Sequence, residues 1–314
     1  MPDDEAADPH YLFTVFTPTF NRATTIGRVH ASLMRQTFTD FEWVIVDDGS
    51  TDDTAELVKG WSDSSWFPIR YLWQPNQGKH VAMNRGVELA RGELFLTIDS
   101  DDECVPTALE RLKHHWDEIP VGSRDGFAAV TALAMDQKGQ LVGTRFPSQV
   151  FDATSIELAY RYKVRGDKWG FTRTAVLREH PFPAPPGTPM IPENLIWDEI
   201  ALTYKTRFVN EFLLINWTRP QGSSIDRSKA AVHLARGLAQ WNLYVLNTHL
   251  PWFRHDPVRF FLSAIRYTRF SLLDRQGPLQ QLRSLANPGA RLLWLATLPL
   301  GAAAFVVDRF RTRR

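Results

Sequence analysis

The chain has 314 residues and a mass of 36.0 kDa, a length that fits one large domain or two. Hydrophobic residues make up 44% of it and charged residues 23%, which excludes a disordered, collagen-like or multi-span membrane protein. Its single cysteine, Cys104, excludes an intrachain disulfide framework and a Cys-based zinc cluster. The acidic start, MPDDEAADPH, is unlike a secretory signal peptide, so we expect a cytoplasmic protein.

The charge is distributed unevenly along the chain. Residues 221–314 contain 14 Lys and Arg against 4 Asp and Glu, a net charge of +10. The first 220 residues contain 22 basic and 31 acidic residues, a net charge of −9. This asymmetry predicts two parts with different partners, at 1–220 and 221–314.

The first hundred residues alternate between strand-like and helix-like patterns. The expected strands are Tyr11–Thr17, Phe41–Val46, Ile69–Trp73 and Leu94–Ile98. The expected helices are Thr24–Gln36, a segment from a Ser50–Asp53 capping box to about Trp61, and Gly78–Ala90. This order predicts an α/β, Rossmann-like and mostly parallel sheet flanked by helices, with ligands beyond the carboxyl ends of its strands.

The rest of the chain is irregular at first and then helical. In the middle we expect strands at Phe127–Met135, Asp167–Thr172 and Phe208–Ile215, a loop at Pro181–Pro192 and a helix at Asn194–Lys205. The helices expected in the C-terminal extension are Ser228–Leu246, Pro257–Leu273 and Leu279–Leu285. The final uncharged run, Leu292–Val307, has 16 residues, which is short for a membrane span.

An acidic cluster, Asp99-Ser100-Asp101-Asp102, follows the fourth expected strand. Carboxylates this close repel one another unless a cation lies between them. Oxygen ligands without His or Cys suit Mg²⁺ or Mn²⁺, which commonly neutralise a leaving diphosphate. Capping of the helix that begins near Pro106 is the alternative, but a cap requires one Asp rather than three. The cluster therefore favours a divalent-metal site.

A second acidic pair, Asp47-Asp48, ends the second strand. One acid here would accept hydrogen bonds from a ribose or from the imide N–H of uracil, and turn capping explains the pair equally well. Two acidic clusters at neighbouring strand ends describe a nucleoside-diphosphate site. Neither GxxxxGK[ST] nor GxGxxG occurs, so the usual glycine-rich phosphate loops are not predicted.

Several segments of the first 220 residues resemble a known family. Thr14–Thr54, TVFTPTFNRATTIGRVHASLMRQTFTDFEWVIVDDGSTDDT, resembles the opening of the family 2 glycosyltransferases, inverting enzymes with the GT-A fold. The pattern continues, in the family's order, at Asn76–His80 (NQGKH), Asn84, Gly92–Asp102 (GELFLTIDSDD), Gly166–Pro183 and Ile191–Glu211. The last two segments are similar to one bacterial branch, and the resemblance extends to about residue 220.

The resemblance implies a set of donor-site residues. Asp48 would contact the base, and Lys79 and Asn84 would lie near the ribose or diphosphate. Asp99 and Asp101 correspond to the family's D-x-D pair, with Asp99 facing ribose and sugar and Asp101 binding Mn²⁺ or Mg²⁺. The other residues expected at the nucleotide pocket are Pro18, Thr19, Asn21, Arg22 and Ser100.

The resemblance also implies a catalytic base at the start of a helix on the acceptor side, where the family often has Glu-Asp. Glu193, Asp198 and Glu199 are available. Counting back from the strand FVNEFLL favours Glu193, although Asn194 replaces the expected Asp. We expect Glu193 to be the base, with Asp198 as the second candidate. A helix-start Glu favoured by the helix dipole is the structural alternative.

These residues imply metal-dependent, inverting transfer of one sugar from a nucleotide sugar, with UDP favoured. The expected acceptor is a hydroxyl of a glycan or lipid-linked molecule in cell-envelope or exopolysaccharide synthesis. Without a QxxRW motif or several long spans, single transfer is favoured over processive synthesis. An inactive sugar-nucleotide-binding or scaffold protein of this fold is the alternative, and the intact DSDD argues against it. TPTFNR is not the Gly-rich loop of a nucleotidyltransferase, and no nucleic-acid partner is expected.

The basic C-terminal region permits two interpretations. Its apolar run and terminal arginines suit the anionic inner surface of the cell membrane, near a lipid-linked acceptor. Helices packed on the catalytic domain, with solvated arginines, are the alternative. We expect peripheral membrane association.

Overall fold

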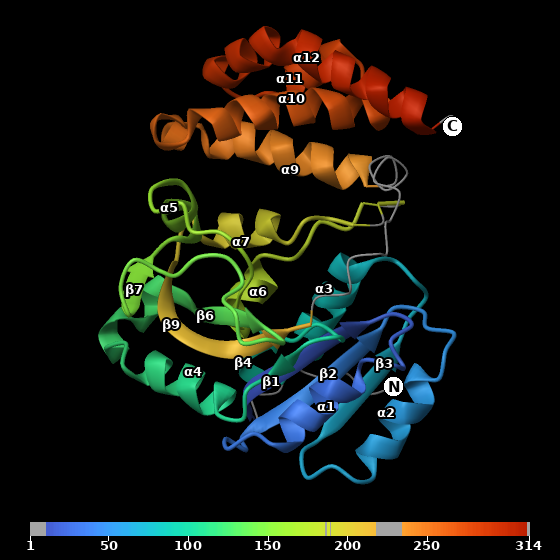
Figure 1. Cartoon of the computed structure of the whole chain (residues 1–314), viewed down its shortest axis with the longest axis vertical. Helices are drawn as coiled ribbons and strands as arrows, with labels where there is room; N and C mark the ends of the chain where they lie inside the picture. The colour runs from blue at the N-terminus through green and yellow to red at the C-terminus, as the bar shows by residue number, and fades with distance from the viewer. Residues whose placement is uncertain (1–10, 186, 189, 218–233, 313–314) are drawn as a thin grey trace. The chain divides into compact units, whose positions relative to one another are not determined.

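The computed structural model describes residues 11–185, 187–188, 190–217 and 234–312 (Figure 1). The chain divides into two compact units, which we describe separately. The first is Met1–Phe182 with Asp198–Thr218, and the second is Pro183–Trp197 with Arg219–Arg314. The segment 183–197 therefore groups with the C-terminal helices, although the expected boundary near 220 assigned it to the first domain.

The first unit is built on a nine-stranded mixed sheet. The strand order is β3-β2-β1-β4-β8-β6-β9-β5, with β7 also paired to β9. β1 to β4 pair in parallel, whereas β8 is antiparallel to both of its neighbours. The strands are β1 Tyr11–Thr19, β2 Phe41–Asp47, β3 Ile69–Trp73, β4 Gly92–Thr97, β5 Glu103–Cys104, β6 Phe127–Asp136, β7 Val150–Ala153, β8 Lys168–Arg173 and β9 Lys205–Asn216. The expected α/β fold is confirmed.

Helices connect these strands. They are α1 Gly27–Met34, α2 Thr54–Ser62, α3 Lys79–Leu89, α4 Ala108–Asp117, α5 Ser155–Tyr160 and α6 Thr174–Glu179, with a short 3-10 helix at Val121–Gly126. α7, Asn194–Ile200, belongs partly to each unit. The helix expected at Asn194–Lys205 is thus shorter than predicted, because the chain turns after Ile200 and Lys205 begins β9.

Alternating side chains give the parallel strands two buried faces. Val15, Trp43 and Ile45 belong to the same core cluster as Leu33 of α1. Phe16, the neighbour of Val15, points to the opposite face and meets α3. At Gly86 of α3 an added Cβ would lie 2.2 Å from the Phe16 ring, so the helix approaches β1 closely only because this residue is glycine. Such double-sided burial explains why the strands are near-continuous apolar runs.

The predicted Ser50–Asp53 capping box is wrong. α2 begins at Thr54, and its N-cap residue Asp53 makes no side-chain capping bond. The Ser50 hydroxyl instead accepts a hydrogen bond from Asn21 N at 2.8 Å. A contact between two loops has therefore replaced the local cap that the spacing indicated.

The C-terminal part of the second unit is helical over its described residues, 234–312, apart from short connections. It contains α9 Ala235–Thr248, the 3-10 segment Leu250–His255, α10 Pro257–Leu273, α11 Pro278–Ser284 and α12 Pro288–Thr312. The first part of the helix expected at Ser228–Leu246 lies outside the described residues. α10 lies between α9 and α12 (Figure 1). Arg269 of α10 donates two hydrogen bonds to Asp308 of α12, at 2.6 and 2.8 Å.

α12 is longer than the uncharged run suggested. It has 25 residues and passes through Pro299. By length and composition, its stretch Pro288–Phe310 is long and apolar enough to cross a membrane, and 22% of its most apolar 18 residues are buried in the structure. Gly301 faces α10, where an added Cβ would lie 2.4 Å from Thr268 Cβ. One face of α12 is therefore packed closely within its unit.

Candidate donor-binding site

The carboxyl ends of the first strands lie at one edge of the sheet. In the parallel register, Thr19 of β1 is opposite Asp47 of β2, and Asp47 is opposite Trp73 of β3. Phe16 of β1 is opposite Thr97, the last residue of β4. Ligands of open α/β sheets bind beyond this kind of edge. The structure thus brings the loops with the predicted donor residues to one edge.

The loops after β1 and β2 are joined by hydrogen bonds through Asn21. Asn21 N donates to Ser50 Oγ, and Asn21 Oδ1 accepts from Thr51 N, both at 2.8 Å. Asn21 has a φ of 52°, a left-handed conformation that Asn tolerates better than most residues. Nearby, Ala23 N donates to Asp52 Oδ2 at 3.0 Å. Asn21 therefore holds the two loops in a fixed relation.

The other residues predicted after β1 lie on the same segment. Pro18 and Thr19 end β1 and are buried. Thr19 Oγ1 is buried without a hydrogen-bond partner among the described residues. Arg22 is half-buried, and its backbone N–H donates to Thr54 Oγ1 at 3.3 Å.

Asp48 attaches the segment before α3 to the end of β2. Its side chain is buried, at 4% exposure, and Oδ1 accepts from Gln74 Nε2 at 2.7 Å and Gln77 N at 2.9 Å. Oδ2 accepts from Gly78 N at 2.7 Å. The carboxylate thus organises the turn that leads into Lys79. Its contact with a base stays a prediction.

Asp47 also has a visible structural role. It is fully buried, accepts from Ser50 N at 2.8 Å and from the Tyr71 hydroxyl at 2.5 Å. Burial and the bonded Asp47 carboxylate raise the pKa of Tyr71. Of the pair, Asp47 supports the loop and the neighbouring strand.

Two predicted residues lie on α3. Lys79, in its first turn, places Nζ 2.6 Å from Asp99 Oδ1, and both side chains are partly exposed. This pair joins a cation to the first acid of the predicted D-x-D motif. Asn84 exchanges two hydrogen bonds of 2.8 Å with the backbone of Phe182, so its amide fixes a distant segment. The predicted contact of Asn84 with ribose or diphosphate stays a prediction.

The acidic cluster lies between β4 and β5. Asp99 and Asp101 are half-buried and Ser100 is buried. Asp102 is 6% exposed and accepts from Trp217 N at 3.0 Å. Burial, together with the nearby carboxylates of Asp99, Asp101 and Asp167, raises the pKa of Asp102 to about 7, although the bond from Trp217 opposes the shift.

Arg28 and Trp217 border this cluster, and no local sequence pattern indicated either residue. Arg28 Nη1 donates to the Asp101 carbonyl at 3.2 Å, and its guanidinium lies 4.3 Å from the Trp217 ring centroid. Trp217 in turn donates its backbone N–H to Asp102. The two residues fix the backbone that carries the acids.

The cluster fits a divalent cation. Its donors are carboxylate oxygens, which Mg²⁺ and Mn²⁺ prefer. Burial is the main cause of the raised Asp102 pKa, and the neighbouring carboxylates add a repulsion that a bound cation would relieve. Asp101 and Asp99 are the accessible members, because Asp102 is buried and bonded to Trp217.

The two candidate bases differ in their environment. Glu193 is half-buried and directly precedes α7, and its carbonyl accepts from Ile196 N and Trp197 N in the first helical turn. Asp198, on α7, is 8% exposed and accepts from Ser155 Oγ at 3.3 Å. Glu193 belongs to the second unit and Asp198 to the first.

The fold is an α/β domain of the GT-A type, and the acidic cluster lies at the sheet edge where such folds bind ligands. Residues 14–168 match the family described as Glycosyl transferase family 2, and this part of the chain belongs to that family. In Escherichia coli, a sequence named uncharacterized glycosyltransferase YibD is 39% identical over 100 residues, which cover 32% of this chain and 28% of the relative. Chondroitin synthase is 37% identical over 148 residues, covering 47% and 21%. The chain therefore matches less than a third of either relative.

Two solved structures share the fold across almost the whole chain. Residues 1–349 of S. aureus TarS, solved with UDP-GlcNAc, superpose with a TM-score of 0.61 at 20% identity, covering 96% of this chain and 92% of that one. The mannosyltransferase PcManGT of Pyrobaculum calidifontis, solved with GDP-Man and Mn²⁺, gives a TM-score of 0.57 at 19% identity, covering 98% and 91%.

Proposed function

We propose that this protein transfers one sugar from a nucleoside-diphosphate sugar, with UDP-sugar favoured, to a hydroxyl of a glycan or lipid-linked acceptor. The transfer inverts the anomeric configuration and serves cell-envelope or exopolysaccharide synthesis. The observation that carries the proposal is the Asp99–Asp102 cluster beside Lys79, at the sheet edge of a family 2 domain. The UDP-GlcNAc and GDP-Man complexes of the neighbours support a nucleotide-sugar donor.

The geometry of this edge supports the proposed donor contacts. Lys79 offers a cation to the diphosphate and already balances Asp99. Thr19 offers a buried hydroxyl, and Asp48 holds the loop that leads into Lys79. The remaining donor contacts are assigned to Pro18, Asn21, Arg22, Asn84 and Ser100. Mn²⁺ or Mg²⁺ held by Asp101 and Asp99 would neutralise charge on the departing diphosphate.

Glu193 is the proposed general base. It would accept the proton of the acceptor hydroxyl while that oxygen attacks the anomeric carbon opposite the leaving group. Such help is worth about 10²–10⁴-fold in rate. Asp198 is the second candidate, but its burial and its bond to Ser155 favour a structural role.

The activity is tested by release of nucleoside diphosphate from UDP-glucose, UDP-GlcNAc and GDP-mannose in the presence of Mn²⁺. One donor should release its nucleotide above the background, and Asp101→Ala should abolish the release. Asp53→Asn, an exposed loop change outside the proposed donor contacts, is the control. Nucleotide binding without release from any donor would support the inactive scaffold instead.

The base assignment is tested in the same assay. Glu193→Gln should lower kcat by about 10²–10⁴-fold with donor affinity unchanged. Asp198→Asn should mainly lower stability. A reversed pattern, with kcat lost only in Asp198→Asn, would transfer the role to Asp198.

Membrane association through α12 is the proposed location of the chain, at the cytoplasmic face. The face of α12 opposite its contact with α10 is apolar and exposed. Its large members are Leu292, Leu295, Leu300, Val306, Val307 and Phe310. A helix that is apolar all round is a core or membrane element, and terminal arginines favour an anionic surface.

Flotation with vesicles of phosphatidylcholine and phosphatidylglycerol tests this location. Leu300→Glu with Val307→Glu should remove most binding, because both charges enter the apolar face. Leu57→Glu, at an exposed apolar position of α2, is the matched control. Equal flotation of all three proteins would show that α12 is not the membrane contact.

A further inference from the structure

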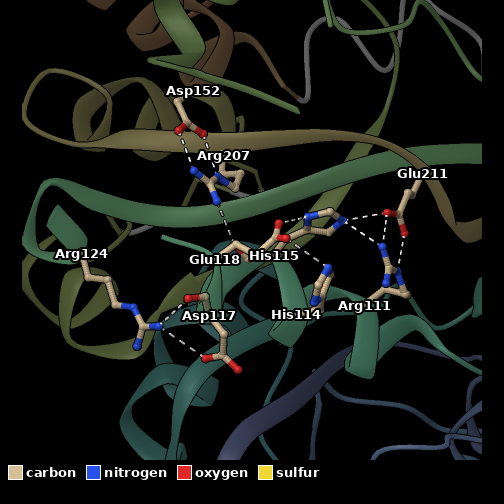
Figure 2. A network of polar contacts seen from close by, with 9 residues as sticks. All are labelled: Arg111, His114, His115, Asp117, Glu118, Arg124, Asp152, Arg207 and Glu211. Atoms are coloured by element: carbon tan, nitrogen blue, oxygen red, sulfur yellow. Dashed lines mark hydrogen bonds and ion pairs between the residues drawn. The ribbon is translucent and has the colours of Figure 1, made fainter. Parts of the chain in front are cut away.

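A second group of metal-ligating side chains lies on α4, outside the donor cluster. His114, His115 and Glu118 each offer one ligand atom, and these atoms lie within 4.8 Å of one another. Figure 2 shows His115 between Glu118 and Glu211 of β9, with His114 beside Glu118. In the sequence these three residues form the pattern HHxxE.

Glu211 determines which nitrogen of His115 carries the proton. Arg111 donates two hydrogen bonds to the Glu211 carboxylate, at 2.6 and 2.8 Å, and so holds it ionised. His115 Nε2 lies 2.7 Å from Glu211 Oε1. Since an ionised carboxylate only accepts, Nε2 must donate its hydrogen. In the neutral ring, Nδ1 is then left with a free lone pair.

That lone pair faces a second acceptor. His115 is 5% exposed, and its Nδ1 has no hydrogen-bond partner among the described residues. Nδ1 lies 3.5 Å from Glu118 Oε2, and His114 Nε2 lies 3.4 Å from Glu118 Oε1. A lone pair and a carboxylate repel each other unless a proton or a cation lies between them. The arrangement therefore requires one of these two occupants.

The distances favour a metal. Ligands bound at about 2.0–2.2 Å around a tetrahedral ion are separated by about 3.3–3.6 Å. The 3.5 Å from His115 Nδ1 to Glu118 Oε2 matches this separation, and His114 Nε2 lies 3.4 Å from the other oxygen, Oε1. His114 is about half exposed and already lies beside the Glu118 carboxylate. The Glu211–His115 bond is the carboxylate–histidine pairing that orients metal-bound histidines. Two imidazoles and one carboxylate suit Zn²⁺, Co²⁺ or Ni²⁺ better than Mg²⁺ or Mn²⁺.

We propose that His114, His115 and Glu118 bind a Zn²⁺-type transition-metal ion, with Glu211 as the positioning residue for His115. The role assigned to the ion is structural. It joins the last turn of α4 to its C-cap residue Glu118, while Glu211 connects His115 to β9 and Arg207 Nη1 donates to the His115 carbonyl at 3.3 Å (Figure 2). This site is independent of the proposed glycosyl transfer.

The test measures Zn²⁺ binding to the full chain carrying Asp101→Ala, so that the donor cluster does not contribute. Competition with a chromogenic chelator should give one equivalent of Zn²⁺, and added Zn²⁺ should raise the melting temperature. His114→Ala and Glu118→Gln should each weaken binding by at least about 100-fold and abolish the thermal shift, since each removes a direct ligand. Both side chains are about half exposed, so the fold should persist, as circular dichroism would verify.

Asp117→Asn is the matched control, because it removes a charge next to Glu118 without touching the three ligands. It should bind Zn²⁺ like the parent, and Glu211→Gln should weaken binding by about 10–100-fold. Unchanged affinity in His114→Ala and Glu118→Gln would overturn the proposal. Absence of Zn²⁺ binding in the parent would also overturn the proposal and would indicate that a proton lies between His115 Nδ1 and Glu118.

Discussion

Asp48→Asn separates the two roles that the second Asp of DDGS can have. In the structure its carboxylate accepts three hydrogen bonds from residues 74–78, and Gly78, one of the donors, directly precedes Lys79. An Asn side chain keeps one oxygen and presents an N–H₂ group to the Gly78 N–H. One charge-assisted bond, worth about 1.5–3 kcal/mol, is lost, and a buried donor is left without an acceptor. We expect a destabilisation of about 3 kcal/mol.

The same change should weaken every nucleotide alike, because it loosens the turn that positions Lys79. Urea unfolding followed by tryptophan fluorescence measures the free energy of unfolding, and calorimetric titration with UDP, GDP and dTDP measures binding. Asp53→Asn, on the same loop but exposed, should alter neither. Stability within about 0.5 kcal/mol of the parent, with selective loss of UDP binding, would refute this reasoning and make Asp48 a base contact.

Two further predictions concern stability. Gly86→Ala should destabilise the protein by about 1–3 kcal/mol in urea unfolding, because the added Cβ meets Phe16. Gly60→Ala, where an added Cβ has nothing within 4 Å, should stabilise it by up to about 1 kcal/mol. Equal effects of the two changes would contradict the close packing of α3 on β1. Burial and the charge of Arg259 lower the pKa of His249 to about 4. The free energy of unfolding is therefore unaffected by His249 above pH 6.5 and decreases as the pH drops toward 4, because the unfolded chain then binds a proton that the folded chain does not. The free energy of unfolding should decrease by about 2 kcal/mol between pH 7 and 5, and His249→Phe should flatten that dependence. Identical pH curves for the parent and His249→Phe would exclude His249 as the cause of the pH dependence.

The parallel half of the fold was predictable because its signals are local. The strands at Phe41–Asp47 and Ile69–Trp73 are apolar runs bounded by turn residues, and α10 begins at Pro257, where proline is favoured in a first turn. β5 and β7 were missed, since strands of 2 and 4 residues carry almost no periodicity. Their pairing with β9 is a long-range property.

The acidic residues at the ends of the strands could be predicted from the sequence, whereas most of their contacts could not. The acids at the ends of β2 and β4 were identified from their position after buried strands. The bonds from Asp48 to residues 74–78 and the packing of Arg28 on Trp217 join segments far apart in sequence, which no local pattern encodes. The HHxxE pattern alone does not predict a metal site, because the tautomer of His115 depends on Glu211, which lies 96 residues away in sequence.

The central claim is a metal-dependent nucleotide site at the Asp99–Asp102 cluster. Calorimetric titration with UDP, GDP and dTDP, each with and without Mn²⁺, on the parent and on Asp101→Ala tests it most directly. We predict that one nucleotide, UDP, binds only with Mn²⁺ and that Asp101→Ala loses this binding. Absence of binding of any nucleotide in the presence of Mn²⁺, or equal binding by Asp101→Ala, would contradict the account.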